Sequence, residues 1–185
     1  IAHDSSRVSC YDRLARMYRT RMRRPTRANE TIQQVIDRNP TSGLAYLSRW
    51  RYEREFLDQQ SDSDLKRAIE LSPNEPQILF AAAINSELRD AVEARGYFEK
   101  GRKLSPKDSV FAIGLARLEV REGHIDRAVA ILREAYAQNP RLELAFALAG
   151  TLIVEDRIDG EGGATTYMEV LRKAGLGETL VRFLE

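Results

Sequence analysis

The chain has 185 residues, of which 43% are hydrophobic and 31% are charged, and its net charge is +1. This length can bury a sizeable core, and no stretch approaches the ~18 consecutive apolar residues that a membrane-spanning helix needs. The single cysteine, Cys10, excludes an internal disulfide and a thiolate metal cage. The sequence starts Ile-Ala-His, without a signal-peptide pattern. We therefore expect a soluble chain that is either a fragment of a longer protein or a processed one. We favour the cytoplasm and expect any targeting signals to lie outside this sequence.

The charge is distributed unevenly along the chain. Residues 1–54 contain twelve arginines and five acidic residues, whereas the remainder contains 17 basic and 23 acidic residues. The N-terminal third is therefore a cationic end on an otherwise acidic body.

The spacing of apolar residues predicts paired helices along the whole chain, and no segment shows the two-residue alternation of a strand. In chain order the predicted helices are 8–22 and 26–38, 43–57 and 62–71, 75–88 and 91–104, 108–122 and 125–138, 142–155 and 163–174, with a short final helix at 177–184.

One helix ending recurs four times. Proline occupies positions 40, 73, 106 and 140, each time after Asn or Ser, and it ends a helix because the residue before it is pushed out of the helical region. A small or modest residue lies five positions before each proline, and a large apolar residue lies eight positions before. These residues are Val35, Ala68, Gly101 and Ala135, and Ile32, Leu65, Phe98 and Leu132.

This pattern of two helices per ~34 residues, with small residues where they cross and a closing proline, resembles the tetratricopeptide repeat. The resemblance implies an all-α, right-handed α-solenoid of about five helical hairpins. It also implies a single domain, because one hairpin cannot bury its apolar face alone. The expected units are 8–41, 42–74, 75–107, 108–141 and 142–175, followed by the capping helix at 177–184.

The sequence offers little for catalysis. His124 has Asp126 nearby, but no nucleophile completes the arrangement, so we interpret it as a turn residue that starts a helix. Cys10 has arginines close in sequence, which can activate a thiol, yet we interpret it as a half-buried cysteine without a catalytic role. The glycines at 160–163 lack the strand and the Gly-Lys-Ser/Thr of a phosphate loop and the spacing of a calcium loop. We expect no enzyme activity, no cofactor and no metal.

The resemblance implies a concave groove lined by the first helix of each hairpin. In that groove, arginines would bind the carboxylates of an extended peptide and apolar side chains would form the floor. The predicted groove residues are Arg16, Arg19, Leu47, Arg51, Arg54, Phe80, Ile84, Ile113 and Arg117. The Lys and Asn pattern with which some family members hold chaperone C-termini is not reproduced at these positions.

We therefore expect a non-catalytic scaffold that binds a protein or peptide of unknown identity. One alternative is an adaptor for nucleic acid or an anionic membrane through the Arg-rich segment 17–27. That segment carries a single aromatic, Tyr18, and no nucleic-acid motif, so our first interpretation is a solvated cationic surface, and neither nucleic acid nor membrane is the expected partner. The remaining hypotheses are an accessory domain of an enzyme that lies outside this fragment, and self-association into a homo-oligomer.

Overall fold

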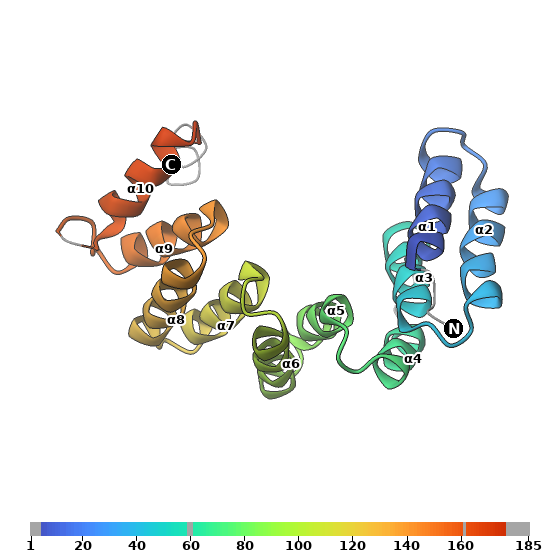
Figure 1. Cartoon of the computed structure of the whole chain (residues 1–185), viewed down its shortest axis with the longest axis horizontal. Helices are drawn as coiled ribbons and strands as arrows, with labels where there is room; N and C mark the ends of the chain where they lie inside the picture. The colour runs from blue at the N-terminus through green and yellow to red at the C-terminus, as the bar shows by residue number, and fades with distance from the viewer. Residues whose placement is uncertain (1–4, 59–60, 161, 177–185) are drawn as a thin grey trace. The chain divides into compact units, whose positions relative to one another are not determined.

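The computed structural model describes residues 5–58, 61–160 and 162–176, and within these ranges every regular element is an α-helix (Figure 1). The all-α prediction is confirmed, whereas the predicted helix at 177–184 lies outside the described residues. The helices are α1 (Ser5–Thr20), α2 (Pro25–Arg38), α3 (Gly43–Phe56), α4 (Ser63–Leu71), α5 (Pro76–Ser86), α6 (Ala91–Leu104), α7 (Ser109–Arg121), α8 (Ile125–Gln138), α9 (Leu142–Val154) and α10 (Ala164–Lys173).

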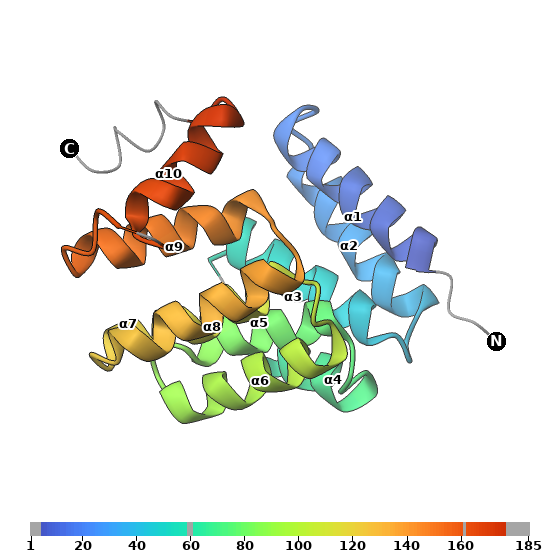
Figure 2. The same cartoon turned by 60° about the vertical axis from the view of Figure 1, so that its left-hand side comes forward.

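The helices form two compact units, Ile1–Ala82 and Ala83–Glu185. In the first unit, α1 and α2 form an antiparallel hairpin, and α3 packs against both of them and against α4 (Figures 1 and 2). In the second unit, each helix from α6 to α10 packs against the next one in the chain. This succession of neighbouring antiparallel helices is the arrangement that the repeat pattern predicts; the domain and repeat boundaries remain predictions.

The prolines end helices as predicted. The C-cap residues of α2, α4, α6 and α8 each precede one of the four repeated prolines, and they are Asn39, Ser72, Ser105 and Asn139. The Asn39 side chain donates a hydrogen bond at 2.9 Å to the carbonyl of Val35, which also accepts the backbone N–H of Asn39 at 3.1 Å. The Asn139 side chain instead donates to the carbonyl of Lys107 at 2.8 Å, and so ties two loops of the second unit together.

Proline and aspartate residues mark the starts of several helices. Pro25 is the first residue of α2, where its missing N–H removes no bond. The Asp90 and Asp108 carboxylates cap α6 and α7 by accepting hydrogen bonds from the backbone N–H groups of Glu93 and Val110. Helix α10 begins at Ala164, one residue after the predicted start, and follows a turn in which Gly160 and Gly162 adopt positive φ values of 97° and 74° that suit glycine.

The core of each unit follows the repeat. Ile32, Leu65, Phe98 and Leu132, the large apolar residues of the pattern, are all at most 3% exposed. In the first unit, one cluster joins α1, α2 and α3, and a second joins α3, α4 and the start of α5 around Leu47, Trp50, Leu65 and Ile78. In the second unit, the core runs from α7 through α10.

Helices α6 and α7 meet through two reciprocal aromatic–glycine contacts. A Cβ atom added at Gly101 of α6 would lie 2.0 Å from the Phe111 ring of α7, and one added at Gly114 of α7 would lie 2.3 Å from the Phe98 ring of α6. Both rings are fully buried. The two glycines therefore allow this close approach, because any side chain would occupy the space of a ring.

Candidate functional site

A cavity of about 420 Å³ in the first unit gathers part of the predicted site. Helices α1 and α3 and the start of α5 line it, and the lining residues are Val8, Ser9, Asp12, Arg16, Leu44, Leu47, Ser48, Arg51 and Gln77. Three of the nine predicted groove residues, Arg16, Leu47 and Arg51, are thus brought together. Leu47 is only 1% exposed, so it supports the cavity wall from the core.

Arg51 differs from the other arginine of this cavity in its burial and in its partners. Its side chain is half-buried, and its guanidinium Nη2 donates a long hydrogen bond of 3.5 Å to the carbonyl of Gln77. Burial lowers the pKa of Arg51 below its usual value; the nearby Asp12 carboxylate opposes this change and the Arg16 cation adds to it. No carboxylate of the described residues lies within ion-pair distance of Arg51. A desolvated guanidinium without a carboxylate partner is poised to accept one from a ligand.

Arg16, the second cation of the cavity, already has internal partners. It donates to Asp12 at 3.0 Å and to Glu55, and its guanidinium lies 5.7 Å from the centre of the Phe56 ring. Burial acts to lower the pKa of Arg16, but Glu55 and Asp12 outweigh it and the pKa is raised. Asp12 also accepts a hydrogen bond from Ser48 at 3.1 Å. This network holds α1 against α3 and fixes the cavity wall.

Two more predicted arginines hold the C-terminal half of α3. Arg19 of α1 donates to the carbonyl of Phe56 at 2.7 Å and lies over its ring, which satisfies one of the carbonyls at the end of α3. Arg54 lies 4.9 Å from the centre of the Trp50 ring and 3.6 Å from the Asp62 carboxylate. Both positions therefore have structural contacts.

The remaining predicted residues lie on α5 and α7. Phe80 is half-buried, Ile84 is 41% exposed, and Ile113 packs partly against the core of α7–α10. Arg117 forms a two-point ion pair with Glu87, with its Nε 2.6 Å from the carboxylate. A groove that joins these residues to Arg51 remains a prediction.

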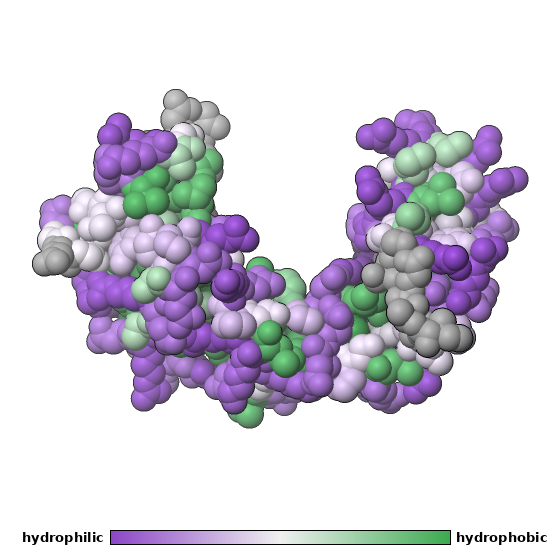
Figure 3. All heavy atoms as spheres, viewed as in Figure 1, coloured by the Kyte–Doolittle hydropathy of each residue, from purple (hydrophilic) through white to green (hydrophobic). Residues whose placement is uncertain are grey.

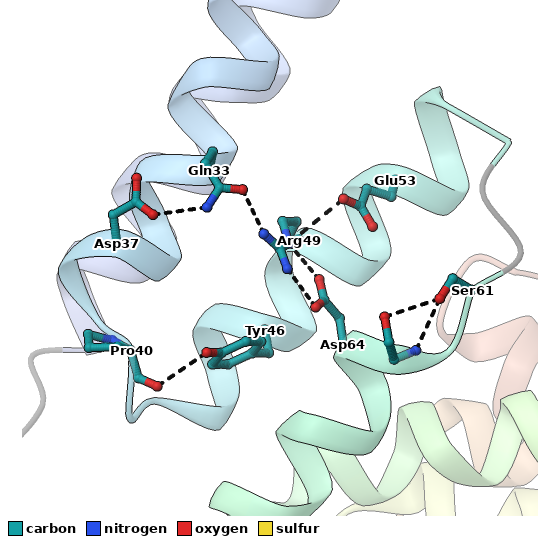
Figure 4. Close-up of polar contacts among 9 residues, drawn as sticks. Gln33, Asp37, Pro40, Tyr46, Arg49, Glu53, Ser61 and Asp64 are labelled. Atoms are coloured by element: carbon teal, nitrogen blue, oxygen red, sulfur yellow. Dashed lines mark hydrogen bonds and ion pairs between the residues drawn. The ribbon is translucent and has the colours of Figure 1, made fainter.

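Sequence reasoning missed Arg49 of α3, whose side chain joins α2 and α4 (Figure 4). Its guanidinium donates two hydrogen bonds to Asp64 of α4, at 2.6 and 2.7 Å, and one to Gln33 of α2 at 2.6 Å (Figure 4). Asp64 is only 6% exposed, so this bridge compensates a buried charge. The burial of Asp64 could not be predicted from the sequence, because acidic residues are also favoured at exposed positions in the first turn of a helix.

A cluster of two glutamates and a histidine lies in the second unit, between α7 and the start of α8. Ligand atoms of Glu119, Glu122 and His124 lie within 4.8 Å of one another. Arg95 of α6 donates to both carboxylates, and it lies 2.9 Å from Glu122, so a guanidinium already supplies the positive charge that a cation would bring. His124 precedes α8 as predicted, but its partner is Glu119 at 3.2 Å and not Asp126.

Cys10 differs from its prediction. It is exposed on α1 rather than half-buried, because the residues of α1 that pack inward lie on the opposite side, around Val8 and Ala15.

Among the described helices, none combines the length and the apolar content needed to cross a membrane.

The fold defines a helical-repeat protein, and comparison with known proteins shows which repeat it resembles. Residues 87–152 match the family model described as Tetratricopeptide repeat. The chain is 25% identical over 152 residues to the Cricetulus griseus interferon-induced protein with tetratricopeptide repeats 2; the match covers 80% of this chain and 32% of the relative, so the chain spans about a third of the length of that protein. These matches confirm the resemblance to the tetratricopeptide repeat that the sequence pattern predicts.

Solved structures show the same fold. PilW, described as a widely conserved type IV pilus biogenesis factor, has a TM-score of 0.68 at 19% identity, over 98% of this chain and 80% of PilW. The Pseudomonas aeruginosa PilF structure has a TM-score of 0.71 at 16% identity, over 97% and 85% of the two chains. A thermophilic tetratricopeptide protein of Thermus thermophilus has a TM-score of 0.64 at 19% identity, over 96% and 97%. At these identities the likeness concerns the fold.

Proposed function

We propose that the chain is a non-catalytic protein-interaction scaffold, and that the cavity of the first unit binds a peptide segment through one acidic side chain. The fold supports a scaffold role in general terms, since tetratricopeptide arrays present surfaces for other proteins. The observation that carries the specific proposal is Arg51: a half-buried cation that lines a cavity and has no carboxylate partner among the described residues.

The side chains that line the cavity restrict the kind of peptide that it would bind. The Arg51 guanidinium offers a planar fork that matches a carboxylate, while Val8, Leu44 and Leu47 provide apolar wall. The Asp12 carboxylate lines the same cavity and repels a second negative charge. We therefore infer an extended segment with one Glu or Asp beside an aliphatic side chain.

Direct binding tests this proposal. The probe is a fluorescein-labelled heptapeptide with a central Glu flanked by Leu. The control peptide is identical except that Gln replaces Glu. Fluorescence anisotropy should show tighter binding of the Glu peptide. Arg51→Gln should weaken that binding about tenfold to a hundredfold, the effect of a lost charge-assisted hydrogen bond, and leave the Gln peptide unchanged.

Arg27→Gln is the matched control, because Arg27 is exposed on α2 and does not line the cavity. Equal binding of the two peptides by the unmodified chain, or equal loss in both variants, would overturn the proposal. A loss in Arg27→Gln alone would point to the Arg-rich segment. The cytoplasmic location favoured from the sequence stays a prediction, and self-association stays one of the alternative hypotheses.

A further inference from the structure

A second surface combines positive charge with apolar side chains. It comprises the outward face of the last turns of α1, the turn that follows and the first turn of α2, and we call it the hairpin tip. Its residues are Arg13, Leu14, Met17, Arg21, Met22, Arg23, Arg24 and Arg27, and all of them are exposed.

No acidic side chain among the described residues neutralises the charge of the hairpin tip. Residues 13–29 contain seven arginines and no Asp or Glu. Arg16 and Arg19 are used within the fold, by Glu55 and by the Phe56 carbonyl. The other five arginines have no ion pair with any described residue. Five guanidinium groups within 15 residues, none of them paired with an acid in the part of the chain that the structure describes, create a local positive potential that the net charge of +1 does not reveal.

Apolar side chains lie among these cations. Leu14, Met17 and Met22 are 38%, 47% and 44% exposed. Leu14 and Met17 share one face of α1 because they are three residues apart. The backbone N–H groups of Arg21 and Met22 both donate to the carbonyl of Met17, at 3.0 and 3.1 Å, which folds the turn back onto the helix end. At the end of the hairpin where α1 leads into α2, hydrophobic surface is visible among hydrophilic surface (Figure 3).

We propose that the hairpin tip docks on an anionic membrane surface. Each exposed arginine near such a surface attracts anionic headgroups, and its guanidinium pairs with phosphate oxygens in a planar, two-point geometry. Met17, Met22 and Leu14 would then enter the boundary between headgroups and acyl chains, as the apolar face of an interfacial helix does. This attachment is peripheral and needs no spanning helix.

The same observations disfavour nucleic acid as the ligand. Sequence-tolerant binding of single strands relies on aromatic platforms, whereas Tyr18 is half-buried and Tyr11 is covered by Arg38, whose guanidinium lies 5.5 Å from the ring centre. Exposed methionine side chains do not stabilise contacts with a phosphate backbone, but they add binding energy when they are buried at a lipid interface.

Vesicle sedimentation tests the proposal. The full chain is mixed with phosphatidylcholine vesicles that carry either no anionic lipid or about 30% phosphatidylserine, at roughly 0.05 M and 0.3 M salt. Binding should require phosphatidylserine and fall with salt. The triple variant Arg21→Gln, Arg24→Gln and Arg27→Gln should lose about a hundredfold in partitioning. Met22→Ser should lose several-fold.

A matched variant of the second unit carries Lys103→Gln, Lys107→Gln and Arg127→Gln, which removes the same charge from exposed sites and should bind vesicles within about twofold of the unmodified chain. Far-UV circular dichroism checks that every variant is folded. Equal losses in the two triple variants, or no binding to phosphatidylserine vesicles at low salt, would overturn the proposal. So would binding of a single-stranded oligonucleotide that depends on the arginines and ignores Met22.

Discussion

Replacement of Gly101 by alanine tests the reciprocal contact of α6 and α7. The added Cβ would lie 2.0, 2.3 and 2.5 Å from three atoms of the Phe111 ring. The ring is fully buried and cannot move into solvent, so we expect an overpacking cost of about 3 kcal/mol. Alanine recovers about 1 kcal/mol of helix propensity. The net loss in the free energy of unfolding is therefore about 2 kcal/mol, or about 4–8 °C in Tm for a chain of this size.

Thermal unfolding followed by far-UV circular dichroism measures the effect, and α6 supplies its own control. Gly96 lies in the same helix, and a Cβ added there meets no atom within 4 Å. Gly96→Ala should therefore raise stability by about 0.5–1 kcal/mol. In the Gly101→Ala background, Phe111→Leu should cost less than it does alone, because the smaller side chain relieves the clash. A Gly101→Ala protein as stable as Gly96→Ala would refute the reasoning.

Three further predictions follow from the buried polar contacts and from Cys10. Arg49→Met should lower the free energy of unfolding by about 3 kcal/mol in urea titrations, because it leaves Asp64 buried and unpaired; a change under about 0.5 kcal/mol would contradict this. Burial acts to raise the pKa of Glu119, but hydrogen bonds from Arg95 and His124 outweigh it and the pKa is lowered. A lowered folded-state pKa gives stability that is present above the ordinary Glu pKa and lost as pH falls through the folded value. Glu119→Gln should therefore flatten the fall of Tm between roughly pH 5 and pH 3, and an unchanged slope would contradict that assignment. Cys10 should react with a thiol reagent such as Ellman's reagent in the native chain as fast as in the urea-unfolded chain; protection in the native state would show that α1 is covered on this face.

The candidate site shows where sequence reasoning stops. The offsets from the repeated prolines indicated which residues of the first helices share a face, and Arg16, Leu47 and Arg51 do line one cavity. The sequence could not tell which arginines already had partners. Arg117 is paired with Glu87, 30 positions away, and Arg16 with Glu55, 39 positions away. Ion pairs of this range depend on how helices pack, and no local pattern encodes them.

The sequence by itself determined the helices and their order. A proline after Asn39, Ser72, Ser105 and Asn139 ends a helix through local sterics, and the spacing of small and large residues fixes which face turns inward. The tertiary structure decided which charges remain for a partner. Arg49 and Arg51 are two residues apart on α3, yet Arg49 neutralises buried Asp64, whereas Arg51 lines a cavity and forms no ion pair with any described residue. The difference arises because side chains two positions apart on a helix point about 200° apart, so Arg49 meets α4 whereas Arg51 faces the cavity.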